Sequence, residues 1–175
     1  MYRKTTLYID IDDTIIAEVL PGSGRDLRPC VITHLTMLGR LFDCCWLTSW
    51  PYSPVDIEPF GVCVQILMRS LYAQSINETF RYANWDHDHP DGKAGFVLDP
   101  AQPDEWYWLE DPIPIGERDA LHAAGKLDRY IPVDPQGPWS FLDAVNELFL
   151  RTGVSRSDFD RIGARPQWFD RSFLS

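Results

Sequence analysis

Apolar runs alternate with amphipathic segments along most of this chain. Short runs rich in β-branched and aromatic residues predict buried strands at residues 7–9, 44–47, 80–83, 106–109 and 130–133. Apolar residues at intervals of three or four predict helices at residues 29–42, 57–73, 116–125 and 139–152. Strands that alternate with helices predict an α/β fold: a three-layer, Rossmann-like parallel sheet with helices on both faces.

Turn signals divide the chain further. The Pro- and Gly-rich residues 21–24 predict a turn, and therefore a short hairpin after the first strand. A proline makes the strand at residues 130–133 an outer one, and Gly153 predicts the end of the last helix. We expect a single domain over residues 1–153. The tail over residues 154–175 is rich in arginine and aromatic residues, and either packs on the domain or forms a partner surface.

The composition is that of a globular protein. The chain has 175 residues, of which 45% are hydrophobic and 24% are charged, and this is enough to form one full core. Its formal net charge of −10 disfavours non-specific binding to nucleic acid or to an anionic membrane. The sequence shows no signal peptide and no membrane-spanning stretch, and its four cysteines have no metal-site spacing. We therefore expect a cytoplasmic protein with reduced thiols, whose oligomeric state the sequence does not indicate.

The first predicted strand ends abruptly in polar residues. After the apolar residues 7–9 come Asp10, Asp12, Asp13 and Thr14. Crowded carboxylates at the end of a buried strand are costly unless a positive charge offsets them, and Mg²⁺ prefers such oxygen ligands. An EF-hand loop also begins with this spacing, but it needs Gly and Glu where this chain has Ile15 and Pro21. The other alternative, an acidic turn without chemistry, remains open.

Two further predicted strands end in polar side chains. Residues 106–109 are followed by Glu110 and Asp111, and residues 44–47 by Thr48. Since ligands of parallel α/β sheets bind beyond the carboxyl ends of the strands, we expect these side chains and Asp10 to converge at one rim. Thr48 could instead cap the segment that follows it.

Lysine is rare in this chain. Lys93 is one of only three lysines, and it alone lies between the strand that precedes Thr48 and the next acidic strand end. Arg69 and Arg81 lie in the same interval, and Lys93 could be an ordinary surface lysine. Asp119 is a weaker acidic candidate, which we expect on a helix.

The loop that precedes Lys93 contains two histidines. His87 and His89 lie in a segment rich in Asp, Pro and Gly, with no third ligand at a helical spacing. This arrangement is more typical of a solvated turn than of a metal site.

The pattern Asp10-x-Asp12-x-Thr14 after an apolar strand resembles the first motif of the haloacid dehalogenase (HAD) superfamily, whose members are mostly phosphatases. The resemblance covers roughly residues 7–152. It implies that Asp10 is the nucleophile and Asp12 the general acid and base. It also implies a small hairpin flap after the first strand.

The same resemblance implies roles for the residues later in the chain. Thr48 would bind an oxygen of the phosphoryl group, and Lys93 would neutralise the nucleophile and the phosphoryl oxygens. The metal ligands for Mg²⁺ would come from Asp10, Asp12, Glu110 and Asp111. The chain departs from the family where Trp50 and Pro51 follow Thr48, and where no glycine precedes the acids at 110 and 111.

The intervals between the motifs bear on the substrate. They fit a flap, single helices and loops, so we expect no large cap domain and an open site suited to bulky phosphorylated substrates. Residues 44–50 and the turn at 133–135 also resemble the small phosphatase-like domains of RNA-repair proteins, although the net charge disfavours nucleic acid. The function that we expect is Mg²⁺-dependent hydrolysis of a phosphomonoester through an aspartyl phosphate. The alternative is a non-catalytic domain that binds a phospho-ligand or a partner.

Overall fold

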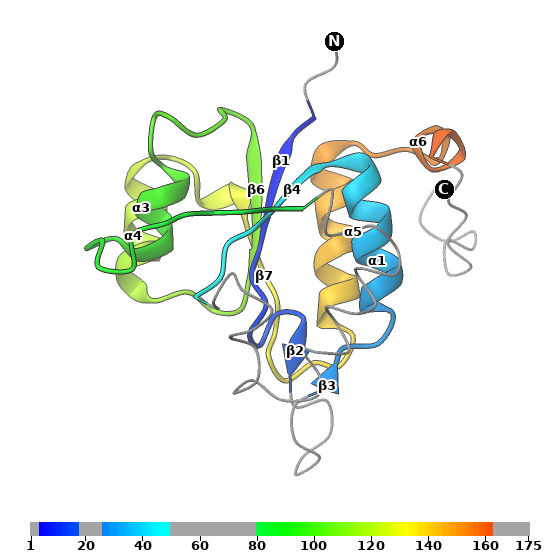
Figure 1. Ribbon diagram of the computed structural model, residues 1–175, viewed down its shortest axis with the longest axis horizontal. Coiled ribbons are helices and arrows are strands. Elements are labelled where there is room, and N and C mark those ends of the chain that lie inside the picture. Colours follow the sequence, from blue (N-terminus) through cyan, green and yellow to red (C-terminus); the bar gives the residue numbers. More distant parts are fainter. Residues whose placement is uncertain (1–3, 18–25, 50–79, 163–175) are drawn as a thin grey trace.

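Five parallel strands form the central sheet, in the order β5-β4-β1-β6-β7 (Figure 1). This arrangement comes from a computed structural model, which describes residues 4–17, 26–49 and 80–162. Each strand pairs in parallel with its neighbour, so all carboxyl ends lie at one edge of the sheet. The strands are β1 (Thr6–Ile9), β4 (Asp43–Trp46), β5 (Arg81–Tyr82), β6 (Trp106–Glu110) and β7 (Tyr130–Pro132).

Helices cover both faces of the sheet (Figure 1). One face carries α1 (Val31–Leu41) and α5 (Ser140–Thr152), which contact each other. The opposite face carries α3 (Gly92–Val97) and α4 (Ile115–Ala123), which also contact each other. The molecule is therefore an α/β protein in which a parallel sheet lies between two helical layers. Among the helices of these described ranges, none has the length and apolarity needed to cross a membrane.

The side-chain alternation of the strands divides the core into two clusters. In β1, Leu7 and Ile9 belong to the cluster under α1 and α5, whereas Tyr8 belongs to the cluster under α3 and α4. In β6, Leu109 and Trp108 divide in the same way. Successive residues of a strand point to opposite faces, so strands that are buried on both faces are apolar throughout.

The predicted strands and three of the predicted helices are present. Strand β7 lies at the edge of the sheet, as its proline indicated. Helix α5 is followed by Gly153, as predicted, and the φ of 66° at Gly153 is a left-handed value that glycine adopts readily. The helix α3 was not predicted. The helix expected at residues 57–73 lies outside the described residues, and so does the interval that bears on a cap domain.

Smaller elements complete the fold. An antiparallel pair, β2 (Ile16–Ala17) with β3 (Asp26–Leu27), follows β1, while the turn expected at residues 21–24 lies outside the described part of the chain. A short 3-10 helix, η2 (Leu127–Arg129), precedes β7.

The described part of the tail lies against the domain. It forms α6 (Arg156–Arg161), whose N-terminus is closed by a capping box between Ser155 and Asp158. Phe159 of α6 is buried and packs edge-on against Phe149 of α5. This part of the tail is therefore attached to the apolar core, and residues 163–175 lie outside the described residues.

Candidate active site

The ends of β1 and β6 bring two acids side by side. The two strands pair in parallel with Ile9 opposite Leu109, so Asp10 and Glu110 follow at the same level. The backbone N–H of Asp10 donates to the carbonyl oxygen of Leu109 at 3.0 Å, which extends this pairing to the first acid. Asp10 and Glu110 are both buried, as expected of side chains that leave a central strand.

Asp10, Glu110 and Asp111 form one cluster of carboxylates. One oxygen atom from each lies within 4.8 Å of the other two. Three buried or half-buried carboxylates at this separation repel one another, and carboxylate oxygens are the ligands that hard divalent cations prefer. The acids of the two predicted strand ends therefore do converge. The carboxylate of Asp12 is not part of this cluster.

Lys93 lies between the two buried acids. Its Nζ is 2.7 Å from Oδ1 of Asp10 and 2.8 Å from each carboxylate oxygen of Glu110. Its side chain is 13% exposed, so this ion pair is well shielded from water. The expected basic residue is therefore at the acidic site. Arg81 instead pairs with Asp43, at the opposite end of the sheet, and Arg69 lies outside the described residues.

The helix α3 places Lys93. Gly92 begins this helix with a φ of 53°, and a Cβ there would lie 2.6 Å from Oε1 of Glu117. Glu117 of α4 in turn accepts the backbone N–H of Ala94 at 3.1 Å, so it holds the first turn of α3. The positive φ favours glycine where the chain turns, and a side chain there would displace the carboxylate that anchors the helix.

Burial and mutual charge shift the pKa values of Asp10, Glu110 and Lys93. Burial raises the pKa of Asp10, although the charge of Lys93 opposes this. Burial, followed by the charge of Asp10, raises the pKa of Glu110 well above its usual range. Burial alone would lower the pKa of Lys93, but the charges of Asp10 and Glu110 outweigh it and raise that pKa. Negative charge therefore exceeds positive charge at this buried rim, which favours the binding of a cation.

Glu110 and Asp111 have different surroundings. Besides its contacts with Lys93, Glu110 accepts Nε1–H of Trp108 at 3.0 Å. Asp111 is held through its backbone: its N–H donates to the hydroxyl of Thr14 at 2.9 Å, and its carbonyl accepts the hydroxyl of Tyr130 at 2.8 Å. Glu110 is thus engaged by protein donors, whereas the half-buried side chain of Asp111 has no hydrogen bond to another described residue.

The loop that carries Asp12 is tightly folded. The carbonyl of Asp12 accepts the backbone N–H of Thr14 at 2.6 Å, and Asp13 between them has a φ of 53°. Asp12 itself is half-buried. Since the hydroxyl of Thr14 binds the backbone of Asp111, this loop and the end of β6 are joined directly.

Thr48 leaves β4 on the other side of β1. The N–H of Leu47 donates to the carbonyl of Ile9 at 3.0 Å, so Thr48 emerges beside the chain that follows Asp10. Thr48 is buried, and its carbonyl accepts Nε1–H of Trp85 at 3.1 Å. The hydroxyl-bearing strand end is thus at the same rim as the acids.

The remaining candidates lie apart from this cluster. Asp119 is exposed on α4, the helix on which it was expected. His87 stacks on Trp85, with ring centroids 4.1 Å apart, and His89 accepts the backbone N–H of Asp91. Within the described ranges, neither histidine belongs to a group of three potential metal ligands.

Two residues of the site were missed in the sequence. Glu117 gives no signal, because its partners are backbone amides on another helix. Arg28 is 2% exposed and donates to carbonyl oxygens on two different loops. The sequence does not reveal the partners of Arg28, because every residue has a backbone carbonyl that could accept its hydrogen bonds.

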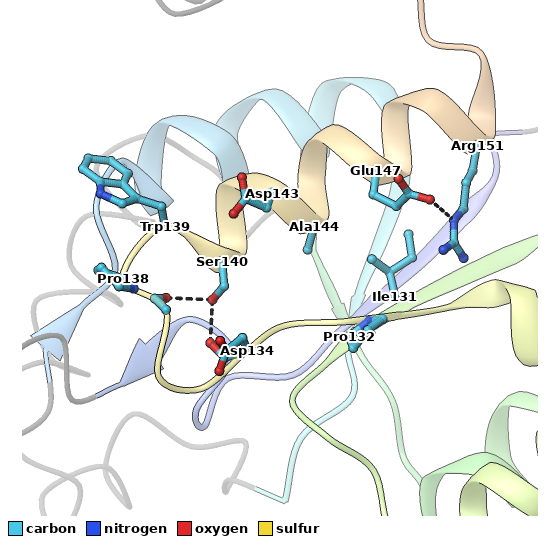
Figure 2. Close-up of a pocket in the computed structure, with 11 residues that line it drawn as sticks. Ile131, Pro132, Asp134, Pro138, Trp139, Ser140, Asp143, Ala144, Glu147 and Arg151 are labelled. Atoms are coloured by element: carbon cyan, nitrogen blue, oxygen red, sulfur yellow. Dashed lines mark hydrogen bonds and ion pairs between the residues drawn. The ribbon is translucent and has the colours of Figure 1, made fainter.

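A groove lies at the outer edge of the sheet (Figure 2). It has a volume of about 540 Å³ and runs between β7 and α5, from Pro138 and Trp139 at one end to Glu147 and Arg151 at the other. Asp134 and Ser140 line it near the first end. The carboxylate cluster is not among its lining residues, so this groove is separate from the acidic rim.

No family model matches the sequence, and no curated protein matches it either. The arguments for function therefore depend on the geometry above.

Proposed function

We propose that this protein is a HAD-like phosphatase, which hydrolyses a phosphomonoester with Mg²⁺ through an aspartyl phosphate at Asp10. One observation carries the proposal: a buried aspartate lies 2.7 Å from a lysine ammonium and within 4.8 Å of two further carboxylates. A carboxylate can attack a dianionic phosphate only if positive charge reduces their repulsion. Lys93 supplies part of that charge, and a cation held by the carboxylates would supply the rest.

The carboxylates fit a magnesium ion by their chemistry. They offer hard oxygen ligands and an excess of negative charge. Asp10 and Asp111 would hold the ion, as would the carbonyl of Asp12, whereas Glu110 is engaged by Lys93 and Trp108. When bound, the ion would neutralise phosphoryl oxygens and align them for in-line attack.

Asp10 supplies the nucleophile. A carboxylate oxygen of Asp10 forms a bond to phosphorus as the bond from phosphorus to the ester oxygen breaks. Asp12 donates its proton to that departing oxygen, which leaves as an alcohol. Asp12 then accepts a proton from water, whose oxygen attacks the aspartyl phosphate and releases inorganic phosphate and the free carboxylate of Asp10. Every proton transfer is thus assigned to Asp12.

Lys93 and Thr48 serve the phosphoryl group. Lys93 lowers the pKa of Asp10 against the effect of burial and offsets charge on the phosphoryl oxygens, while Glu110 holds the ammonium in place through two contacts of 2.8 Å. The hydroxyl of Thr48 would donate a hydrogen bond to a phosphoryl oxygen at the end of β4. The substrate class is that of phosphorylated molecules, which the rim itself does not narrow further.

The test is hydrolysis of a generic aryl phosphate with and without Mg²⁺. We expect activity that needs the ion, vanishes in Asp10→Asn and falls strongly in Asp12→Asn. The matched control is Asp119→Asn, which makes the same change at an exposed site on α4 and should leave the rate unchanged. Equal rates for the wild-type protein and Asp10→Asn, after purification from contaminants, would contradict catalysis and favour a non-catalytic phospho-ligand-binding domain.

A further inference from the structure

Arg28 joins two loops that lie far apart in the sequence. Its Nη2 donates to the carbonyl oxygen of Asp13 at 2.7 Å and to that of Asp134 at 3.0 Å. Its Nη1 donates to the carbonyl oxygen of Gly137. The guanidinium therefore spans the loop after β1 and the loop between β7 and α5. A planar group with several fixed donors can make such contacts simultaneously, which a lysine cannot.

The second of these loops is itself firmly held. The hydroxyl of Ser140, at the start of α5, approaches the carbonyl oxygens of Asp134 and Gly137 at 2.6 Å and 2.8 Å (Figure 2). These are the same two carbonyls that accept Arg28. Arg28 is thus attached on one side to a turn that is anchored to a long helix of the core.

The first loop needs such an anchor. Asp13 has a φ of 53°, a left-handed conformation that costs a residue with a side chain about 1 kcal/mol. Asp13 immediately follows Asp12, so the direction in which Asp12 projects depends on this peptide. The backbone N–H of Arg28 also donates to the carbonyl of Ile15 at 3.0 Å, so Arg28 binds the loop at two points.

The terminal nitrogens of Arg28 are directed at the backbone of the protein itself. Arg28 is 2% exposed, and both of its terminal nitrogens face carbonyl oxygens. Burial lowers the pKa of Arg28, although the charges of Asp13, Asp134 and Asp111 oppose this. Burying a charged arginine costs free energy, and its hydrogen bonds to the carbonyl oxygens of the two loops offset part of this cost.

We propose that Arg28 is a positioning residue, which fixes the loop of Asp12 to Thr14 against the start of α5 so that Asp12 stays aimed at the leaving-group oxygen. This inference rests on the proposed role of Asp12 as general acid. It predicts a defect in the two proton transfers of Asp12, but not in the release of a leaving group that departs without a proton.

The kinetic test compares two substrates in Arg28→Lys. An alkyl phosphate needs protonation of its leaving oxygen, whereas p-nitrophenolate leaves without it. We expect kcat for the alkyl phosphate to fall about tenfold or more, with KM changed less than about twofold. The first-turnover release of p-nitrophenolate, which precedes any need for Asp12 as a base, should slow less than about threefold. The control is Arg151→Lys, since Arg151 donates to the carbonyls of Asp128 in η2 and Tyr130 in β7. The control should slow both substrates equally or not at all.

Hydrogen exchange gives a readout that does not need activity. In Arg28→Lys, the amides of Asp13 to Ile16 should exchange at least about tenfold faster, while those of β4 keep their protection. If Arg28→Lys does not fold, Ser140→Ala removes one hydroxyl from the same anchor and should give the same pattern more weakly.

The outcomes separate the inference from the proposed function. An equal loss in kcat for the alkyl phosphate and in the first-turnover release of p-nitrophenolate, or no change in either, would overturn the positioning role while leaving the phosphatase intact. A wild-type protein inactive on both substrates would overturn the proposed function. In that case faster exchange limited to Asp13–Ile16 would still support the anchor, and unchanged exchange there would overturn it.

Discussion

Both carboxylate oxygens of Glu110 lie 2.8 Å from Nζ of Lys93. Both oxygens of Glu110 are therefore paired with Lys93, whereas the carboxylate of the adjacent Asp111 has no hydrogen bond to another described residue. Two neighbouring acids thus have different surroundings: one holds the ammonium of Lys93, and the other is the one that we propose as a ligand of Mg²⁺. This division leads to the first prediction.

Glu110→Gln and Asp111→Asn should differ in their response to Mg²⁺. Asp111→Asn should raise the Mg²⁺ concentration for half-maximal aryl phosphatase activity at least about tenfold, because a ligand oxygen loses its charge. Glu110→Gln should lower kcat with less change in that concentration, because it loosens Lys93. The measurement is a Mg²⁺ titration of the rate, with Asp119→Asn as the control. Identical shifts in both variants would refute the division of roles.

Lys93→Met should destabilise the fold as well as abolish activity. It leaves Asp10 and Glu110 buried without their cation, and removing one partner of a buried ion pair costs about 3–5 kcal/mol. The loss should shrink as the pH falls, since protonation removes the uncompensated charge. Urea unfolding in the presence of a chelator measures this.

The double variant Lys93→Met/Glu110→Gln provides the internal check on that result. It removes one of the unpaired charges, so it should be more stable than Lys93→Met alone. If the double variant is the less stable of the two, the unpaired charge is not the cause of the loss.

Gly92→Ala should impair both α3 and the site. Its φ of 53° is unfavourable for alanine, and the new Cβ would lie 2.6 Å from Oε1 of Glu117. We expect a loss of about 1–3 kcal/mol in the free energy of unfolding and a lower kcat. Gly116→Ala on α4 is the matched control: a Cβ there meets nothing within 4 Å, so stability should be unchanged or slightly higher. Equal effects of the two changes would disprove this account.

His34 should make the stability depend on pH. It is fully buried in α1, its Nδ1 contacts the carbonyl oxygen of Cys30 at 2.7 Å, and burial lowers its pKa below the ordinary value. The unfolded chain therefore takes up a proton more readily than the folded one. The stability from the neutral ring is complete above the unfolded pKa of about 6.5, and is lost as the pH falls below it.

The comparison with His34→Gln isolates this effect. Between pH 7 and pH 5, the wild-type protein should lose more free energy of unfolding than the variant, because the variant lacks the titrating ring. His122→Gln, at an exposed position near the end of α4, should behave like the wild type. Parallel curves for the wild type and His34→Gln would exclude the histidine as the cause.

Much of the site could be predicted because a simple rule governs parallel sheets. Their strands all end at one edge, so polar residues directly after apolar runs gather there, as Asp10, Glu110 and Asp111 do. Lys93 was predicted because the family resemblance implies a basic residue between Thr48 and the next acidic strand end, and Lys93 is the only lysine in that interval. The helix that carries it was not, since α3 is short and its glycines and small residues give no helical period.

By itself, the sequence determined the alternation of strands and helices and the acids at two strand ends, because these depend on local periodicity and on the burial of apolar side chains. Only the tertiary structure decided that Glu110 rather than Asp111 holds Lys93, that Glu117 anchors α3, and that Arg28 joins two loops. Neighbouring acids look alike in a sequence, and backbone amides and carbonyls are common to every residue. Which acid pairs with Lys93, and which backbone groups pair with Glu117 and Arg28, is therefore decided by the packing of the folded chain.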